Sequence, residues 1–236
     1  MVRVIGVDVA EQRKGLDLVG LDDQRRIVER RTRATVEDVR TMVTALRPQA
    51  VCIDSPPSWS LNGNSRAAER ELRVLGITAF LTPTDPGDHP FYRWMRAGFA
   101  IFDAVADAYP RYRSGPVLQT AMEVFPEATA VVLAGERRPR AESKVVFRRR
   151  VLAAHGVDAG ALPSLDAVDA ALAALTGLIA LDGHFVGVGA PEEGVVVLPT
   201  STLPSTPFRI ATPLPARPRP MEPGATSLAT FETHSR

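Results

Sequence analysis

Several carboxylates occupy positions from which they could act together on one ligand. Asp8 and Asp54 each follow a short apolar run, VRVIGV and AVCI. Such runs are typical of strands buried on both faces, and the active sites of open α/β sheets gather beyond the carboxyl ends of strands. Asp166 and Asp169 are three residues apart at the start of an Ala- and Leu-rich segment, a spacing that places both on one helix face. We therefore expect these side chains to meet if that helix crosses the sheet.

Such a cluster would repel itself unless cations neutralised it, because like charges at short range destabilise one another. Hard carboxylate oxygens favour Mg²⁺ or Mn²⁺ over zinc. Two such ions about 3.5–4 Å apart can activate a water molecule and stabilise the leaving oxygen of a phosphodiester. The chemistry expected from the cluster is therefore metal-dependent phosphodiester hydrolysis.

The same carboxylates also have structural interpretations. Asp8 and Asp54 could accept hydrogen bonds from loop N–H groups at the strand ends. Asp166 could be the N-cap of the helix, with Asp169 placed favourably in the first turn. The joint occurrence of all of them favours a functional cluster. Glu123, in the segment MEVFPE, could be an additional ligand or a general base, or a surface carboxylate at a sheet edge.

Basic side chains offer contacts for a phosphate-bearing substrate. Arg66 and Arg70 are one helical turn apart and could grip a phosphate, although the nearby Glu69 and Glu71 favour a solvated, salt-bridged face. Lys144 and Arg148 are also one turn apart and begin the strongest basic run of the chain, a candidate for a contact with a nucleic-acid backbone.

Among the aromatic residues, Trp59 is the better candidate for stacking on a base, because it lies in a loop directly after the second acidic strand. Trp94 falls at helical spacing with Phe and Met residues and is expected in the core. The histidines are scattered without ligand spacing, and the sequence contains no GxSxG, Walker A or Rossmann glycine motif.

A mixed sheet would position these residues. Residues 2–10 predict a buried strand. Residues 15–21 and 26–34 alternate apolar with polar side chains and, with the polar turn between them, predict an antiparallel hairpin. A helix is predicted from Thr35 onward, followed by a second buried strand over residues 50–54.

The rest of the chain predicts further strands over residues 118–125 and around 184–188 and 194–198. The helices expected there cover residues 65–75, 91–109, 127–134, 142–155 and 164–181.

The order of these motifs resembles the RNase H-like superfamily, in which acidic residues come from the first strand, a later strand and a C-terminal helix. The run that begins at Asp166, DAVDAALAA, is similar to the terminal helix of RuvC-type Holliday-junction resolvases. Over about residues 2–190 the chain resembles more closely an uncharacterised bacterial and archaeal family of predicted RNase H-like nucleases. The shared motifs are GxDxA at 6–10, IDxP at 53–56, an Arg-rich helix at 66–73, ExxP at 123–126 and DAxxAA at 166–171.

This resemblance implies an α/β, RNase H-like fold with a mixed central sheet and helices on both faces. It also implies a core site of Asp8, Asp54 and Asp169, with Asp166 beside them. In the expected mechanism Asp8 bridges two Mg²⁺ (or Mn²⁺) ions, Asp54 holds one ion, and Asp166 or Asp169 holds the other while water attacks phosphorus. The expected partner is a nucleic acid or a nucleotide.

Charge and composition limit these possibilities. The net charge of +1 gives no global basic field, so a small or single-stranded substrate is easier to explain than a duplex. The one cysteine lies in an apolar run, which fits a reducing compartment. The N-terminus lacks the pattern of a signal peptide, and no apolar run approaches the roughly 18 residues of a membrane span. We therefore expect a soluble, cytoplasmic protein without a membrane partner.

The composition changes after Pro199. Residues 200–236 are rich in Pro, Ser and Thr and have little apolar periodicity, which predicts a disordered tail. The expected organisation is one RNase H-like domain over residues 1–199, followed by this tail.

Two other functional classes stay open. One is a non-catalytic binding or regulatory module that keeps the fold. The other is an actin-like ATP-binding protein, which would need two such domains and Gly/Thr-rich phosphate loops, and residues 8–14 contain no such loop.

Overall fold

Three antiparallel strands open the chain, as the alternating pattern predicts. The computed structural model describes residues 1–10 and 14–211. In it β1 (Val4–Asp8) is buried along its whole length and pairs antiparallel with β2 (Leu16–Leu21). β2 in turn pairs antiparallel with β3 (Ile27–Ala34).

Parallel strands extend the sheet from the other side of β1. β4 (Ala50–Asp54) pairs with β1, β5 (Thr120–Glu123) with β4, and β7 (Gly194–Leu198) with β5, all in parallel. β6 (Val186–Ala190) closes the far side antiparallel to β7, so the order is β3-β2-β1-β4-β5-β7-β6. The carboxyl ends of β1, β4, β5 and β7 therefore share one edge of the sheet, which we call the carboxyl edge.

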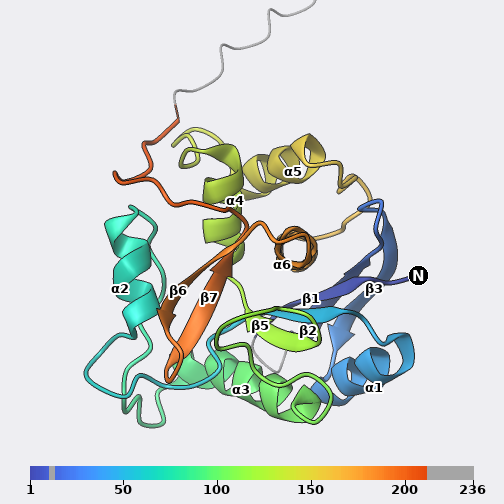
Figure 1. Ribbon diagram of the computed structural model, residues 1–236, viewed down its shortest axis with the longest axis horizontal. Helices are drawn as coiled ribbons and strands as arrows, with labels where there is room; N and C mark the ends of the chain where they lie inside the picture. Colours follow the sequence, from blue (N-terminus) through green and yellow to red (C-terminus); the bar gives the residue numbers. More distant parts are fainter. Residues whose placement is uncertain (11–13, 212–236) are drawn as a thin grey trace, which may run out of the picture.

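Helices cover both faces of the sheet, and α2 lies beside β6 (Figure 1). This arrangement confirms the predicted α/β fold with a mixed central sheet and helices on both faces. α1 and α3 pack on one face and α6, flanked by α4 and α5, on the other. The helices are α1 (Val36–Leu46), α2 (Ala67–Val74), α3 (Arg93–Val105) after the short 3₁₀ helix Pro90–Tyr92, α4 (Pro126–Ala134), α5 (Lys144–Ala154) and α6 (Leu165–Leu181).

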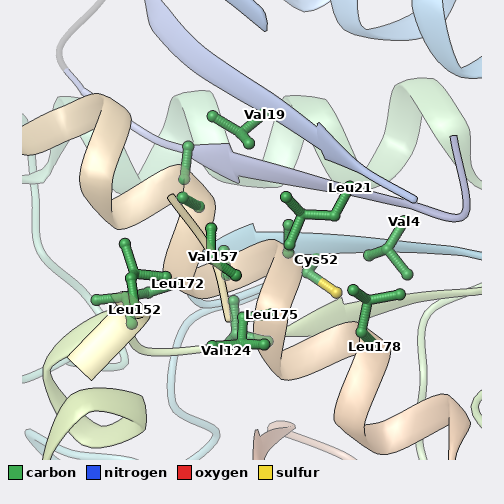
Figure 2. Packing of buried hydrophobic residues seen from close by; sticks show 14 of the residues in the cluster. Val4, Val19, Leu21, Cys52, Val124, Leu152, Val157, Leu172, Leu175 and Leu178 are labelled. Atoms are coloured by element: carbon green, nitrogen blue, oxygen red, sulfur yellow. The ribbon is translucent and has the colours of Figure 1, made fainter. Parts of the chain in front are cut away.

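The α6 face of the sheet forms the largest part of the core. The Ala- and Leu-rich sequence of α6 is buried along almost its entire length, because the helix lies between the sheet and the helices α4 and α5. Figure 2 shows Leu175 and Leu178 of α6 packed towards Val4 and Cys52 of the sheet. Burial raises the pKa of the Cys52 thiol, so this cysteine behaves as a small apolar core residue.

α6 approaches β1 unusually closely, and Gly6 permits that approach. A Cβ atom at Gly6 would lie 2.1 Å from the carbonyl oxygen of Ala170 and 2.4 Å from the amide nitrogen of Ala174. Gly177 of α6 is equally restricted, since a Cβ there would lie 2.4 Å from the Cys52 sulfur. The backbone of the helix therefore rests against the backbone of the strand that ends in Asp8.

The packed part of the chain continues beyond the expected boundary at residue 199. The amide of Phe208 donates to the carbonyl of Leu75, and Arg137 exchanges backbone hydrogen bonds with Arg209 and Ala211. The ring of Phe208 also packs against the hydrophobic cluster that includes Leu72 and Leu75. Residues 200–211 thus lie on the domain instead of belonging to a free tail, while 212–236 fall outside the described residues.

In the described ranges, no helix combines the length and the apolar character needed to cross a membrane.

Candidate active site at the carboxyl edge of the sheet

Three aspartates form a row across neighbouring strands. Asp8 is the register partner of Asp17 on β2 and of Asp54 on β4. Directly paired residues of adjacent strands point to the same face, here the face covered by α6, because Val4 and Gly6 of β1 also contact that helix. The β4 strand thus brings Asp54 beside Asp8, and each aspartate ends a buried strand, as the two apolar runs predicted.

Helix α6 adds its carboxylates over this row. Ser164 is the N-cap of α6: its hydroxyl accepts from the amide of Ala167 and donates to the Asp17 carboxylate at 3.0 Å. The structural alternative in which Asp166 caps the helix is therefore excluded. Asp166 and Asp169 follow in the first turns, and both raise the pKa of Asp8, so the four predicted carboxylates lie within electrostatic reach of one another.

Burial and mutual repulsion make these carboxylates hard to ionise. Burial raises the pKa of Asp8 well above its ordinary value, and the neighbouring charges of Asp54, Asp169, Asp166 and Asp17 raise it further. Burial also raises the pKa of Asp54, where Asp169 adds to the effect. The site is therefore an acidic cluster whose ionised form needs neutralisation by cations.

Arg148 supplies part of that neutralisation. Its guanidinium donates to Oδ2 of Asp169 and, at 2.6 Å, to Glu127. Burial raises the pKa of Asp169 to about 6, although Arg148 opposes the shift. The other oxygen of Asp169, Oδ1, is buried and accepts no hydrogen bond from the described part of the chain. A buried carboxylate oxygen without a donor is a position that a cation would satisfy.

The donor chemistry fits a divalent metal ion, but the described side chains do not converge on one. Within residues 1–10 and 14–211, no group of three or more His, Cys, Asp or Glu side chains is arranged to hold a metal ion. The hard oxygens of Asp8, Asp54 and Asp169 have the right chemistry for Mg²⁺ or Mn²⁺. The ion pair between Asp169 and Arg148 keeps one of these oxygens occupied.

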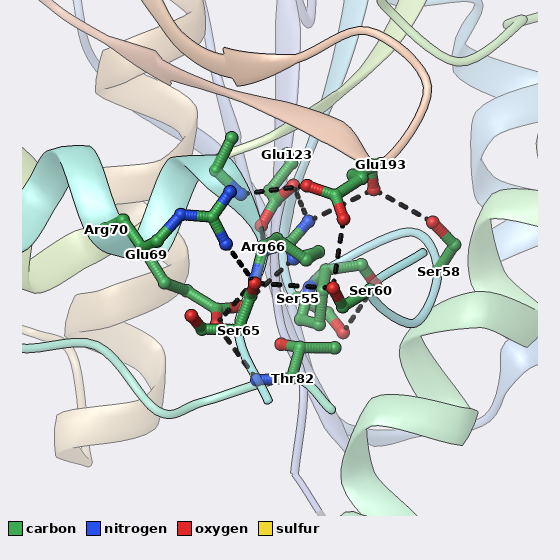
Figure 3. A network of polar contacts seen from close by, with 12 residues as sticks. Ser55, Ser58, Ser60, Ser65, Arg66, Glu69, Arg70, Thr82, Glu123 and Glu193 are labelled. Atoms are coloured by element: carbon green, nitrogen blue, oxygen red, sulfur yellow. Dashed lines mark hydrogen bonds and ion pairs between the residues drawn. The ribbon is translucent and has the colours of Figure 1, made fainter. Parts of the chain in front are cut away.

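Glu123 and Arg66 form a separate buried ion pair beside the cluster, shown in Figure 3. The Arg66 guanidinium donates to both oxygens of Glu123, at 2.8 and 2.5 Å, and its Nε donates to Glu69 at 3.0 Å. Arg66 is only 2% exposed. Its donors are used within the protein, so the structure gives Arg66 a structural role instead of the expected contact with substrate phosphate.

Glu193 completes this network from the turn between β6 and β7 (Figure 3). Its carboxylate accepts from the amides of Leu61 and Ala67 and from the Ser60 hydroxyl, all at 2.8–2.9 Å. Although burial works against it, these hydrogen bonds lower the pKa of Glu193. The network therefore joins the end of β5, the start of α2 and the β6–β7 turn beside the acidic cluster.

A cavity of about 420 Å³, which we call the site cavity, opens at one side of the cluster. Asp54 and Asp169 line it together with Arg148, Lys144 and Arg137. An acidic floor with basic walls suits a ligand that carries phosphate and metal together. Of the basic residues singled out in the sequence, Lys144 and Arg148 thus belong to this cavity.

Arg70 lies elsewhere. It is exposed on the outer side of α2, where its guanidinium donates to the backbone carbonyl of Ser65.

Sequence reasoning missed several residues that shape the site. Asp17 and Glu127 both contact it, through the N-cap of α6 and through Arg148. Asp17 could have been found from its place in the predicted hairpin, opposite the end of the first strand. Glu127 and Glu193 lie far along the chain from their partners and carry no local pattern that indicates those contacts.

Comparison with known proteins identifies a family. A family model described as "Protein of unknown function (DUF429)" matches residues 6–193, which is most of the chain and includes every member of the carboxylate cluster. No curated protein matches the sequence.

Two solved structures of RuvC from Thermus thermophilus are similar to the chain. One is a complex with a Holliday junction substrate; it is 17% identical, with a TM-score of 0.42, and the match covers 78% of this chain and 97% of that one. The other, described as the Thermus thermophilus RuvC structure, is also 17% identical over the same shares, with a TM-score of 0.41.

Proposed function

Since the chain belongs to the DUF429 family of proteins of unknown function, its activity has to be argued from the site, and we propose that it is a metal-dependent nuclease. The reaction is hydrolysis of a phosphodiester bond in nucleic acid at the carboxylate cluster. The observation that carries this proposal is the register of Asp8 with Asp54 beneath Asp169, which gathers carboxylates that repel one another beside a cavity with basic walls.

The residues of the cluster and of the cavity wall would have different roles in binding metal and phosphate. Asp8 and Asp54 would hold the metal ion, with Asp169 and Asp166 as the further candidate ligands. A bound Mg²⁺ or Mn²⁺ lowers the pKa of water and stabilises charge on the leaving oxygen. Lys144, exposed at the start of α5, would hold a phosphate oxygen at the wall of the site cavity.

Arg148 and Glu123 act differently from the direct roles expected of them. Arg148 orients Asp169 and lowers the repulsion within the cluster through its ion pair. Glu123 is held by Arg66 and positions the end of β5, so we assign it a supporting role and not that of a general base.

A second candidate function is binding of nucleic acid without cleavage. The observation that favours it is the Asp169–Arg148 ion pair, which occupies a carboxylate that the metal mechanism needs. Both candidates place the ligand in the same cavity, so only an activity measurement separates them.

The test is a cleavage assay with labelled single-stranded, double-stranded and branched DNA, and with RNA, in Mg²⁺ or Mn²⁺. Asp8→Asn keeps the shape of the side chain but removes its charge, and Asp23→Asn is the matched control in an exposed turn. Cleavage that needs metal, vanishes in Asp8→Asn and persists in Asp23→Asn supports the nuclease. Binding of substrate with no cleavage by any of the three proteins would favour the binding module.

A further inference from the structure

A second cavity at the carboxyl edge has aromatic walls. This aromatic cavity has a volume of about 390 Å³ and is lined by Phe80, Phe91 and Trp94, among others. The ring centroid of Phe80 lies 5.3 Å from that of Phe91 and 6.0 Å from that of Trp94. Phe80 is 62% exposed and Phe91 41% exposed. Exposed aromatic rings gathered around a concavity are typical of a ligand site, because a folding core would bury them.

The inner wall of the aromatic cavity is polar. Ser55, Arg66, Glu69 and Glu123 line it, so the buried ion network of Figure 3 forms this wall. The Arg66 donors are used within the network, but the carboxylate oxygens of Glu69 and Glu123 have further lone pairs that can accept from a ligand. An aliphatic ligand would offer these oxygens no donor. A flat ring with a polar edge, such as a nucleobase, stacks on the aromatic side chains and can hydrogen-bond at its edge.

The aromatic cavity adjoins the site cavity. Asp54 lines both of them, as do Ala79, Phe80 and Phe125. A ligand that extends from one cavity into the other would therefore pass over Asp54. In a nucleotide unit the base and its phosphate are joined through one sugar, so a base in the aromatic cavity brings its own backbone next to the carboxylate cluster.

A third cavity continues from the other end of the aromatic one. It has a volume of about 860 Å³ and shares Ala10 and Lys14 with the aromatic cavity. Arg33, Arg93 and Arg96 also line it, and we call these three arginines with Lys14 the basic groove. Glu37 is the acidic residue of its lining. Basic grooves that follow a backbone next to aromatic stacking surfaces are the usual means of binding single strands.

We propose that the aromatic cavity binds one unpaired base of a single-stranded nucleic acid, whose flanking phosphates lie along the basic groove. This inference rests on the proposed function and names its substrate class. In an intact duplex the bases are stacked and paired, so none can enter the cavity unless it is flipped out at a cost in free energy. DNA and RNA share the required chemistry, and the test distinguishes them.

The first test measures binding without cleavage. Single-stranded DNA and RNA oligonucleotides carrying one 2-aminopurine are titrated with the full-length protein in EDTA, beside the same sequences as duplexes. Quenching of 2-aminopurine reports stacking on an aromatic side chain. We expect single strands to bind at least about 10-fold more tightly than duplexes, with salt-dependent affinity. Equal affinity for single strands and duplexes, or no binding of single strands, overturns the inference.

The second test uses variants of the cavity wall. Phe80→Ala, at an exposed position, is expected to weaken binding by about 5- to 100-fold and to abolish the quenching, while Trp94→Phe keeps most of both. Leu118→Ala is the matched control, because Leu118 is equally exposed but precedes β5 at the opposite edge of the sheet. Thermal melting verifies that each variant is folded. Wild-type affinity in Phe80→Ala overturns the inference.

The experiments distinguish failure of the nuclease proposal from failure of the base-site proposal. If single strands bind through Phe80 but are not cut in Mg²⁺ or Mn²⁺, the base site stands and the nuclease fails. If metal-dependent cleavage needs Asp8 but is unchanged in Phe80→Ala, the nuclease stands and the base site is overturned.

Discussion

At the scale of single residues, the carboxylate cluster opposes folding of the metal-free protein at neutral pH. Burial raises the pKa of Asp8 and Asp54, and that of Asp169 from 3.8 to about 6. A group whose pKa is higher in the folded than in the unfolded state binds its proton more tightly when folded. Its contribution to stability is therefore present at low pH and is lost as the pH rises, for Asp169 between about 4 and 6.

Removing one of these charges should stabilise the metal-free protein. We expect Asp8→Asn to melt at a higher temperature than wild type in EDTA at about pH 7.5, by about 2–4 °C for each 1 kcal/mol of repulsion relieved. The difference should shrink towards pH 4, where the wild-type carboxyls are protonated. Differential scanning calorimetry measures both.

Addition of Mg²⁺ or Mn²⁺ should then reverse the order, because cations stabilise only the protein that binds them. Asp23→Asn, at an exposed turn, should follow wild type throughout. A lower melting temperature for Asp8→Asn in EDTA would contradict the electrostatic account of the cluster.

Arg66, in contrast to the clustered aspartates, is a buried charge that stabilises its neighbours, because it neutralises Glu69 and Glu123. Replacing it with methionine leaves Glu69 and Glu123 buried without their cation. We expect Arg66→Met to lower the free energy of unfolding by about 3–5 kcal/mol, whereas Arg70→Met, one turn away and exposed, changes it by less than about 0.5 kcal/mol. Urea denaturation followed by circular dichroism measures both. Similar stabilities of the two variants would show that the network contributes little.

At the scale of elements, the distance between α6 and β1 controls the geometry of the site. Gly6→Ala places a Cβ atom 2.1 Å from the Ala170 carbonyl oxygen, so the helix has to move away from the strand. We expect a loss of about 1–3 kcal/mol in stability and a larger relative loss of metal-dependent activity, since Asp169 moves with the helix.

The matched control is Gly160→Ala, where the nearest neighbour of an added Cβ is the side-chain oxygen of Asp158 at 3.1 Å, the end of a side chain and not backbone. Urea titration and the cleavage assay together report the two effects. Gly6→Ala with wild-type activity and stability would mean that the helix does not need its close approach.

Much of this element-level architecture was predictable from the sequence. The runs that end in Asp8 and Asp54 predicted buried strands, and the Ala-rich segment predicted the buried helix. Each of these patterns is local, with a period of two or an unbroken apolar run. Thr35 and Asp38 likewise form a capping box at the start of α1, where the helix was predicted to begin.

The features that were not predictable depend on long-range contacts. The sequence could not indicate that Arg148 pairs with Asp169 and Glu127, or that Arg66 turns inward to Glu123 while Arg70 stays outside. Helical spacing fixes which residues share a face but not which tertiary partner that face meets. Trp59, the expected stacking residue, packs its ring edge-on against Tyr92 and Phe99. Trp94, expected in the core, lines the aromatic cavity instead.

At the scale of the whole molecule, the end of the domain can be located by truncation. We propose that the domain extends to Ala211. A chain ending at Pro199 loses the contacts of Phe208 and of the strand-like pairing with Arg137, and should melt several degrees lower than a chain ending at Ala211. The chain ending at Ala211 should melt with the full-length protein. Equal melting temperatures for these two chains and the full-length protein would mean that the domain ends at residue 199.

The overall charge conceals how charge is distributed. A net charge of +1 predicted little attraction for nucleic acid, yet Lys14, Arg33, Arg93 and Arg96 line one groove that adjoins the aromatic cavity. Local basic grooves attract phosphate at short range even when the molecule as a whole is nearly neutral. Single-stranded substrates need only such a local surface.

The close contact at Gly6 also restricts which substitutions the family can accept at this position and at the helix positions that face it. A side chain at position 6 could be accommodated only if the backbone of α6 moved outward, and Ala170 and Ala174 would have to change with it. Relatives that keep all the aspartates should therefore keep glycine at this position and small residues at the two facing ones. Lineages that have lost the aspartates are released from that coupling, so the three positions should vary independently there. An alignment of the family could use this covariation to separate members with an intact cluster from members that have kept only the fold.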